Sequence, residues 1–167
     1  MSVIRFEPTR DLRLVKAIMI HDKVWPYISD DGSPAPAEFA PCDSPHVLYL
    51  LCFDGDSLLG LWMFSQVNYV TVEVHTCLLP QHGFHRSREA AKLASQWIWD
   101  NTQCQRIVTN VPKNNRIARK FAEAAGMEQF GLNPRSFMKN GELQDQILLG
   151  ISRPQEIGID MNAKECA

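Results

Sequence analysis

The spacing of apolar residues along the chain changes several times, and each change marks an expected element. Apolar residues alternate with polar ones, or run without interruption, in seven segments that we expect to be strands: residues 3–7, 46–53, 57–68, 69–79, 106–111, 136–139 and 144–152. They recur every three or four positions in three segments that we expect to be helices: residues 9–22, 87–102 and 117–125. The stretch 26–45 contains five prolines and predicts a long loop.

The order of these elements predicts the fold class. A strand and a helix come first, then three strands, a helix, a strand, a helix and a closing hairpin around Asn140-Gly141. This order predicts an α/β protein with a mixed central sheet of about six or seven strands flanked by helices. We expect one domain over residues 1–153. Residues 154–167 are polar and unpatterned, and we expect them to form a loosely ordered tail.

Composition narrows the function classes. The 167 residues carry a formal net charge of −2, which leaves no electrostatic case for a nucleic-acid or membrane-surface protein. No apolar run approaches the ~20 residues of a membrane span, and the N-terminus does not resemble a secretory signal. The five cysteines have no close paired spacing, which is typical of a reducing compartment. We therefore expect a cytoplasmic protein.

A basic loop before the second helix is a candidate anion site. A strand ends at Leu79-Pro80, and the next residues supply several basic side chains before and within the first helical turns: His82, His85, Arg86, Arg88 and Lys92. Free N–H groups at a helix start favour an anion, and arginines add charge. Such a cluster would suit a pyrophosphate. The alternative is that these residues are ordinary solvated side chains beside a helix end.

A second segment favours the anion site. The run from Asn115 to Met127, NRIARKFAEAAGM, resembles the N-x-x-A-x-x-x-(aromatic)-x-x-x-G-(Phe/Met) segment of the GNAT superfamily of acetyl-CoA-dependent N-acetyltransferases. The order of elements is similar to that fold as well, so the resemblance covers nearly the whole chain up to about Arg153. It is similar in particular to small GNAT-like proteins carried by bacteriophages. The resemblance implies acetyl-CoA as cosubstrate, an amine-bearing acceptor, and a homodimer as one assembly.

The resemblance also implies where the coenzyme lies. Acetyl-CoA would occupy a V-shaped opening where the strand ending at Leu79 diverges from the strand at residues 106–111. Backbone groups at one strand end would pair with the pantetheine arm: Cys77, Leu78 and Leu79. The following loop and helix start would hold the pyrophosphate through four residues: His85, Arg86, Ser87 and Arg88. Asn115 would contact the arm from the other side.

The resemblance implies a general base on the strand before the phosphate loop, because an amine acceptor must lose a proton before it attacks a thioester. Glu73 and His75 both lie there and share one face with Cys77 by period-two alternation. We expect His75 to take the proton, with Glu73 orienting it or acting through water. The alternative is that His75 is a sheet histidine and Glu73 an edge charge.

Two departures from the family pattern favour a second hypothesis. The three phosphate-loop slots hold His85, Arg88 and Ala90, so the glycines are missing. Ala122 occupies the position of the tyrosine that protonates the leaving thiolate, which would leave this role to Tyr69 or to a water. A GNAT-fold protein that has lost catalysis and works as a binding or assembly factor, for example in a virus, is therefore the alternative.

Two further groups of residues are candidate sites. A zinc cluster would take ligands from one stretch, His75, Cys77, His82 and His85, but their spacing matches no compact structural site, and we expect no metal. The acceptor side would be the first helix, the long loop and the closing strands, where His21, Trp25, Tyr27, Asp30 and Asp31 cluster, with a wall from the sheet side made of Trp62, Phe64, Phe137 and Met138. Aromatic residues of this kind are more often core than pocket.

Overall fold

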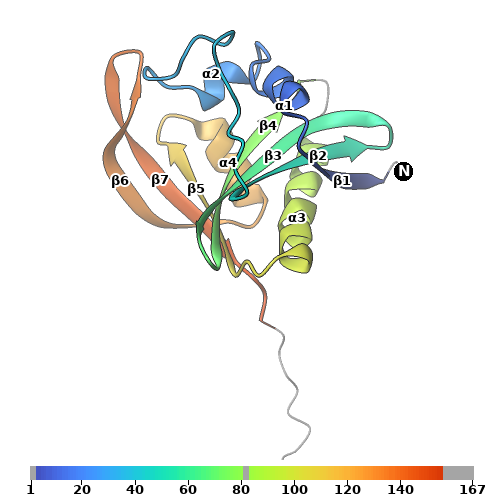
Figure 1. Cartoon of the computed structure of the whole chain (residues 1–167). Coiled ribbons are helices and arrows are strands. Elements are labelled where there is room, and N and C mark those ends of the chain that lie inside the picture. Colours follow the sequence, from blue (N-terminus) through green and yellow to red (C-terminus); the bar gives the residue numbers. More distant parts are fainter. Residues whose placement is uncertain (1–2, 81–82, 156–167) are drawn as a thin grey trace, which may run out of the picture.

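The computed structural model describes residues 3–80 and 83–155 (Figure 1). Four helices and seven strands follow one another along the described chain: β1 (Ile4–Thr9), α1 (Leu12–Met19), α2 (Trp25–Ile28), β2 (Val47–Asp54), β3 (Ser57–Asn68), β4 (Thr71–Leu78), α3 (Phe84–Asn101), β5 (Arg106–Pro112), α4 (Arg116–Ala124), β6 (Glu128–Lys139) and β7 (Glu142–Ser152). Within the described residues, no helix is long and apolar enough to cross a membrane. Most of the predicted tail, residues 156–167, lies outside the described part.

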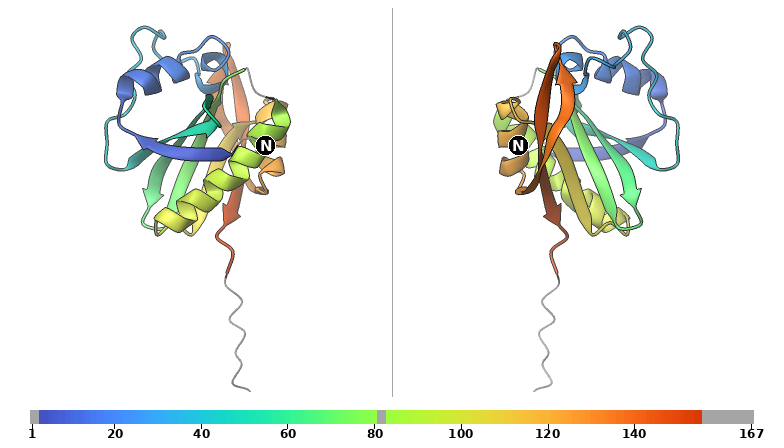
Figure 2. Two further views of the ribbon diagram at one scale, coloured as in Figure 1. Left: turned by 90° about the vertical axis from the view of Figure 1, so that its right-hand side faces the viewer. Right: turned by 90° about the vertical axis from the view of Figure 1, so that its left-hand side faces the viewer.

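The strands form one mixed sheet with the order β1-β2-β3-β4-β5-β7-β6. Only β4 and β5 run parallel, since every other neighbouring pair is antiparallel. Figure 2 shows α1 and α2 on one side of the sheet, called here the α1 face, and α3 and α4 on the other, called the α3 face. Each face has its own apolar core, built around Tyr49 and Leu61 on the α1 face and around Leu50 and Ile107 on the α3 face. The predicted mixed α/β sheet is confirmed.

The element boundaries differ from the sequence prediction in three places. The proline-rich stretch contains the short helix α2, with Pro26 in its first turn. Helix α3 begins at Phe84, three residues before the expected start, and Gly83 at its N-cap supplies no side-chain cap. Strand β6 begins at Glu128 and is much longer than the predicted 136–139, because irregular registers allow it to stay paired with β7. The Asn140-Gly141 turn is present with positive φ at both residues, as its sequence predicts.

Strands β4 and β5 separate soon after they pair. Their register spans three residue pairs and ends at Glu73 opposite Val108, although β4 continues for five more residues. Leu79 donates its N–H to the Leu59 carbonyl of β3, whereas the Val70 carbonyl accepts from Arg106 of β5. Because backbone groups of successive strand residues point to opposite edges, odd-numbered residues of β4 bond β3. The backbone groups of Val74, Thr76 and Leu78 therefore face the opening.

The far end of β4 is held against β3 by a close backbone approach. Gly60 has a φ of 155°, next to a register shift between β2 and β3. A Cβ built on Gly60 would lie 2.3 Å from the Cys77 carbonyl oxygen. Only glycine therefore allows β3 to approach β4 here, which fixes the edge of β4 that borders the opening.

We predict that Gly60→Ala lowers the free energy of unfolding by about 2–4 kcal/mol, through backbone strain and the clash with Cys77. Urea unfolding measures this loss. Gly32→Ala is the control, because its Cβ would meet only Asp30 at an ordinary 3.5 Å and its stability should change by less than about 1 kcal/mol. Equal stability of the two variants would contradict the prediction.

Candidate functional site

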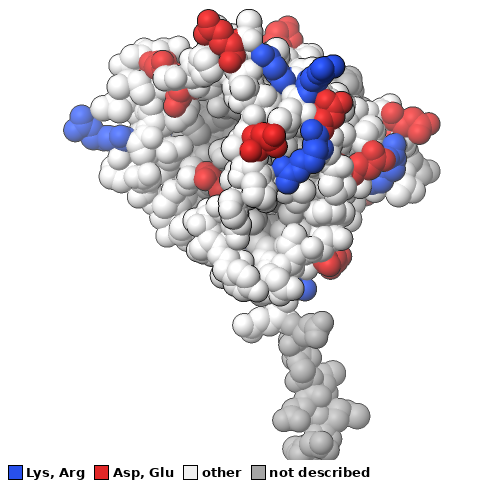
Figure 3. Space-filling view, viewed as in Figure 1, with Lys and Arg blue, Asp and Glu red and all other residues white. Residues whose placement is uncertain are grey.

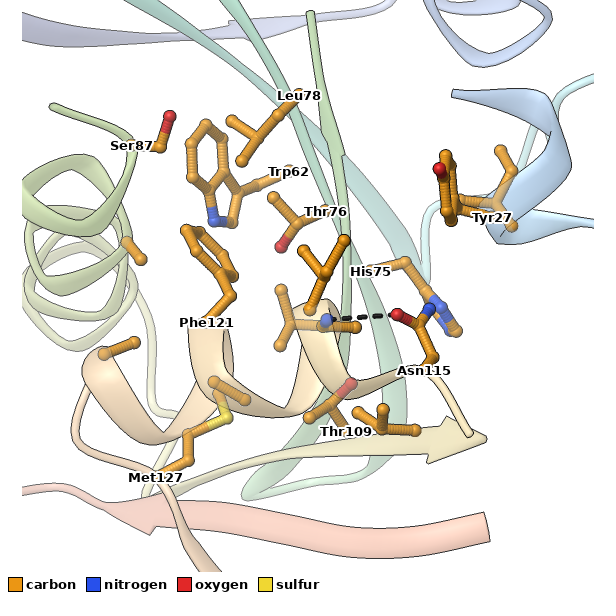
Figure 4. A pocket seen from close by; sticks show the side chains of 18 of the residues that line it. Tyr27, Trp62, His75, Thr76, Leu78, Ser87, Thr109, Asn115, Phe121 and Met127 are labelled. Carbon is orange, nitrogen blue, oxygen red and sulfur yellow. Dashed lines mark hydrogen bonds between the residues drawn. The ribbon is translucent and has the colours of Figure 1, made fainter. Parts of the chain in front are cut away.

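A cavity of about 530 Å³ occupies the opening between β4 and β5. Its wall on the α3 face comes from α3, α4 and the even-numbered side chains of β4, and its wall on the α1 face includes Tyr27, His75 and Phe137. Figure 4 shows Thr76, Leu78, Trp62 and Phe121 on one side of β4, with Tyr27 and His75 on the other. The cavity therefore passes through the sheet and is bordered by both of its faces.

Glu73 is hydrogen-bonded to a residue of β5 and lies next to the imidazole of His75. Asn110 donates a 2.9 Å hydrogen bond from Nδ2 to Glu73 Oε1, and His75 Nε2 lies 3.5 Å from the same oxygen. The His75 side chain is 40% exposed and lines the cavity, whereas the Glu73 side chain is 25% exposed. The structure thus brings together the two residues expected to work on the proton, and it adds Asn110, which fixes the Glu73 carboxylate.

The residues predicted to bind the pyrophosphate lie at the start of α3, but their environments differ. Ser87 is buried, lines the cavity and donates its hydroxyl to the Gly83 carbonyl. Arg86 binds Asp54 of β2 through two nitrogens and also Glu89, and these carboxylates raise the pKa of its guanidinium. His85 and Arg88 are exposed. Arg86 therefore ties the first turn of α3 to β2.

The Cys77 side chain points to the α1 face, as that of His75 does, but it does not line the cavity because the apolar core of that face covers it. There the thiol is fully buried in the core with Val15 and Leu61, and burial raises its pKa to about 12. Its backbone, like that of Leu79, is turned toward β3. Of the three strand-end residues predicted to pair with the coenzyme, only Leu78 presents its backbone to the opening.

Asn115 is the N-cap of α4 and also lines the cavity. Its side-chain oxygen accepts a 3.1 Å hydrogen bond from the Ala118 N–H (Figure 4). Ala122, in the position of the family tyrosine, contributes to the cavity wall. Tyr69 precedes β4, 77% exposed, and is not among the cavity residues, so it does not replace that tyrosine.

Sequence reasoning missed two hydroxyl side chains of the site, Thr76 and Thr109, which both line the cavity. The alternation that placed Glu73 and His75 on one face also places Val74, Thr76 and Leu78 on the other. That signal was present in the sequence. It becomes informative only when the sheet is known to open at this point.

The expected acceptor residues are only partly gathered around the cavity. Tyr27, Trp62, Phe64 and Phe137 line it, whereas the remaining candidates do not: His21, Trp25, Asp30, Asp31 and Met138. Asp30 accepts hydrogen bonds from Gly32 and Ser33 within its own turn. His82 lies outside the described residues, and among the residues that are described no three potential ligands gather to hold a metal.

Asp31 fastens the loop after α2 to the β6–β7 hairpin. Its carboxylate accepts hydrogen bonds from the backbone N–H groups of Asn140 and Gly141, at 2.8 and 2.7 Å. Beside it, Lys139 donates to the Ser29 carbonyl at 2.6 Å. These bonds hold together the two segments that carry Tyr27 and Phe137, on the α1 side of the cavity.

The charged side chains on the face seen in Figure 3 alternate in sign. Acidic and basic residues are interspersed, mostly over the upper half of this view, and neither sign forms a continuous patch there. This distribution agrees with the small net charge of −2. Long-range attraction of a strongly charged partner to this face is therefore weak.

A family model described as "Protein of unknown function (DUF2824)" matches residues 40–156. Comparison with curated protein sequences finds no match. Among solved structures, spermidine N-acetyltransferase from Vibrio cholerae in complex with CoA and spermine is similar, with 18% identity and a TM-score of 0.74 over 89% of this chain and 95% of that chain. Ribosomal-protein-S5-alanine acetyltransferase from Vibrio fischeri has 16% identity and a TM-score of 0.68, over 89% and 91% of the two chains. The GNAT fold expected from the sequence is confirmed.

We predict that Asp31→Ala lowers the melting temperature at pH 6 and that this difference shrinks as the pH falls below 4. The two backbone N–H donors hold the pKa of Asp31 below its ordinary value of 3.8, so its stabilisation is present above that pH. It is lost as the pH falls through the folded-state pKa. Thermal unfolding of wild type and variant between pH 6 and pH 2.5 measures the difference.

Asp56→Ala is the control, because this exposed aspartate lies in the β2–β3 turn, away from the cavity. Its melting temperature should follow that of the wild type at each pH. A difference for Asp31→Ala that stays constant down to pH 2.5 would show that the carboxylate does not hold the hairpin.

Proposed function

The chain belongs to the DUF2824 family, described as being of unknown function, and from its site we propose that it is an N-acetyltransferase that uses acetyl-CoA. The observation that carries this proposal is the cavity through the sheet, bordered on one edge by the backbone groups of β4. Such an edge can take up a chain with alternating amide groups, as the pantetheine arm has. The CoA complex of the V. cholerae neighbour supports the same cosubstrate.

The two faces of the opening suit the two substrates. We place the pantetheine arm along Val74, Thr76 and Leu78, with the pyrophosphate near Ser87 and the start of α3. The acceptor amine enters from the α1 face, past Tyr27 and Phe137. The neighbours are named for a polyamine and for a ribosomal protein, so the shared acceptor class is an amine.

In the proposed reaction the amine nitrogen attacks the thioester carbonyl carbon. A C–N bond forms, the C–S bond breaks, and CoA leaves as a thiolate that takes a proton. His75 receives the proton of the amine, and Glu73, itself held by Asn110, orients the imidazole. Backbone N–H groups of β4 at the opening stabilise the charge that develops on the carbonyl oxygen. Placing amine and thioester together supplies much of the rate gain.

Three features are unfavourable for efficient catalysis and favour the alternative, a binding or assembly factor. The helix start has no glycine-rich loop, Arg86 is bound to Asp54, and alanine occupies position 122, where the resemblance would place a tyrosine. The homodimer stays a prediction from the resemblance. It would use the outer edge of β6, which has no neighbouring strand within the described sheet.

Titration calorimetry with acetyl-CoA and with free CoA tests the coenzyme site. We expect micromolar binding of both. Arg88→Ala should weaken it about tenfold, because this exposed arginine forms no ion pair within the described residues and its charge is available to a phosphate. Arg13→Ala on α1, also exposed and not among the cavity residues, should bind like wild type.

Absence of binding by well-folded wild type would overturn the proposed function and favour the binding or assembly factor. If the wild type binds and Arg88→Ala binds equally well, the phosphate is held by other groups at the start of α3.

We predict that His75→Ala lowers kcat for acyl transfer about 100-fold or more while acetyl-CoA affinity changes little, because only proton removal from the amine is lost. Steady-state kinetics with an amine acceptor found by screening measures kcat, and calorimetry measures the affinity. His46→Ala is the control, since this exposed histidine is hydrogen-bonded to Gln66 and is not among the cavity residues. A kcat for His75→Ala near that of the control would exclude His75 as the base.

A further inference from the structure

The cavity extends beyond the opening into the apolar core between the sheet, α3 and α4. Its wall there is made of residues that belong to the core of the α3 face: Trp62, Phe64, Ala91, Ala94, Ile107, Val111, Ala122, Ala125 and Met127. We call this part of the cavity the core lobe. In Figure 4, Trp62 of β3, Phe121 of α4 and Met127 of the turn after α4 lie around it.

The core lobe is apolar and depends on small side chains. Two helices face each other across it with alanines, Ala91 and Ala94 from α3 and Ala122 from α4. Ser95 also lines it, but its hydroxyl is bonded to the Ala91 carbonyl. Among the described cavity residues, Lys23 and His75 are the ones with ionisable basic side chains, and both belong to the α1 side. The lobe therefore suits a hydrocarbon better than water or an ion.

A hollow of this kind is costly unless something fills it. Protein cores are packed to the density of organic crystals, and each unfilled volume loses dispersion contacts and destabilises the fold. A leucine at Ala94 or Ala122 would fill the lobe at no cost in polarity. The lobe is also continuous with the opening in which the proposed thioester lies, so its natural occupant is the group carried by that thioester.

This inference rests on the proposed function: we propose that, besides acetyl-CoA, the site accepts CoA thioesters with a longer unbranched acyl chain, and that this chain lies in the core lobe. The bonds that form and break are the same as in acetyl transfer. The amine forms an amide with the acyl carbon, the thioester C–S bond breaks, and the proton of the amine passes to His75. A longer chain would reach further into the lobe than a two-carbon acetyl group. A chain of about four to six carbons would bury its methylenes against Trp62, Phe121 and Met127.

Titration calorimetry with free CoA and with acetyl-, butyryl- and hexanoyl-CoA tests this proposal. Burying one methylene is worth about 0.8 kcal/mol, which corresponds to a roughly fourfold gain in affinity. We therefore expect hexanoyl-CoA to bind at least tenfold more tightly than acetyl-CoA. Ala94→Leu and Ala122→Leu, which place side chains in the lobe, should bring the ratio of the two affinities close to one.

Ala124→Leu is the matched control, because Ala124 lies on the same helix as Ala122 but is not a cavity residue. It should keep the wild-type ratio. The ligand-free melting temperature gives a second readout: it should not fall in Ala94→Leu or Ala122→Leu, since the added side chain fills existing space. A drop of more than a few degrees in both would indicate that the lobe is already packed, and would overturn the proposal.

The outcomes separate this proposal from the proposed function. If free CoA and acetyl-CoA bind but affinity does not rise with chain length, the acyl-chain proposal fails and the acetyltransferase proposal stands. If no CoA derivative binds, both fail. If affinity rises with acyl-chain length equally in the wild type and in Ala94→Leu and Ala122→Leu, the chain lies outside the core lobe, and the proposal is also overturned.

Discussion

The early separation of β4 from β5 is the constraint on which the rest of the structure depends. A strand in the middle of a sheet normally satisfies its backbone groups on both edges, and buried N–H and C=O groups without partners are costly. Here the parallel register ends at Glu73 opposite Val108, and β4 continues beside a cavity. The chain therefore offers, at the centre of its own sheet, an edge that a ligand with amide groups can complete.

Contacts between segments distant in sequence fix the elements that surround this opening. Gly60 allows β3 to stay paired with β4 up to the end of β4, because a side chain there would clash with the Cys77 carbonyl. Arg86 binds the first turn of α3 to Asp54 on β2. On the other face, Asp31 and Lys139 fasten the loop after α2 to the closing hairpin. Each contact joins segments distant in sequence, so the opening is a property of the whole sheet. A rigid frame of this kind would keep the two proposed substrates in one geometry, as the proposed acyl transfer requires.

Much of the sheet could be predicted from local patterns, whereas the assignment of site residues could not. Apolar patterning predicted at least part of each of the seven strands, and period-two alternation correctly placed Glu73, His75 and Cys77 on one face. It did not show that α1 covers only part of that face, so Cys77 is buried under the helix while His75 lines the cavity. Arg86 had every local feature of a phosphate ligand. Its partner Asp54 is 32 residues away, and no spacing rule indicates such a pair.

The first part of β6 and the short helix α2 were not predicted, because neither has a regular apolar pattern in the sequence. Residues 128–135 are mostly exposed and lack a regular alternation, because register shifts against β7 turn their side chains irregularly. In α2, four residues are too few to show a helical period, and Pro26 looks like a loop signal although it suits the first turn of a helix. Both elements border the α1 side of the opening, where Tyr27 and Phe137 stand. The sequence therefore predicted less of the α1 side of the opening than of the strand β4 that borders it.

The cavity has chemically different surroundings on its two sides, as the proposed transfer between two substrates requires. A polar ligand edge along β4, a titratable pair at Glu73 and His75, and an apolar lobe between α3 and α4 lie around a single space. Side chains of successive β4 residues supply these features alternately, since His75 faces the α1 side and Thr76 the α3 side. His75 and Thr76 therefore border the same cavity from opposite sides of the sheet although they are adjacent in sequence. In the proposed reaction, this arrangement would let the acyl group on one side of the opening meet an amine that enters from the other.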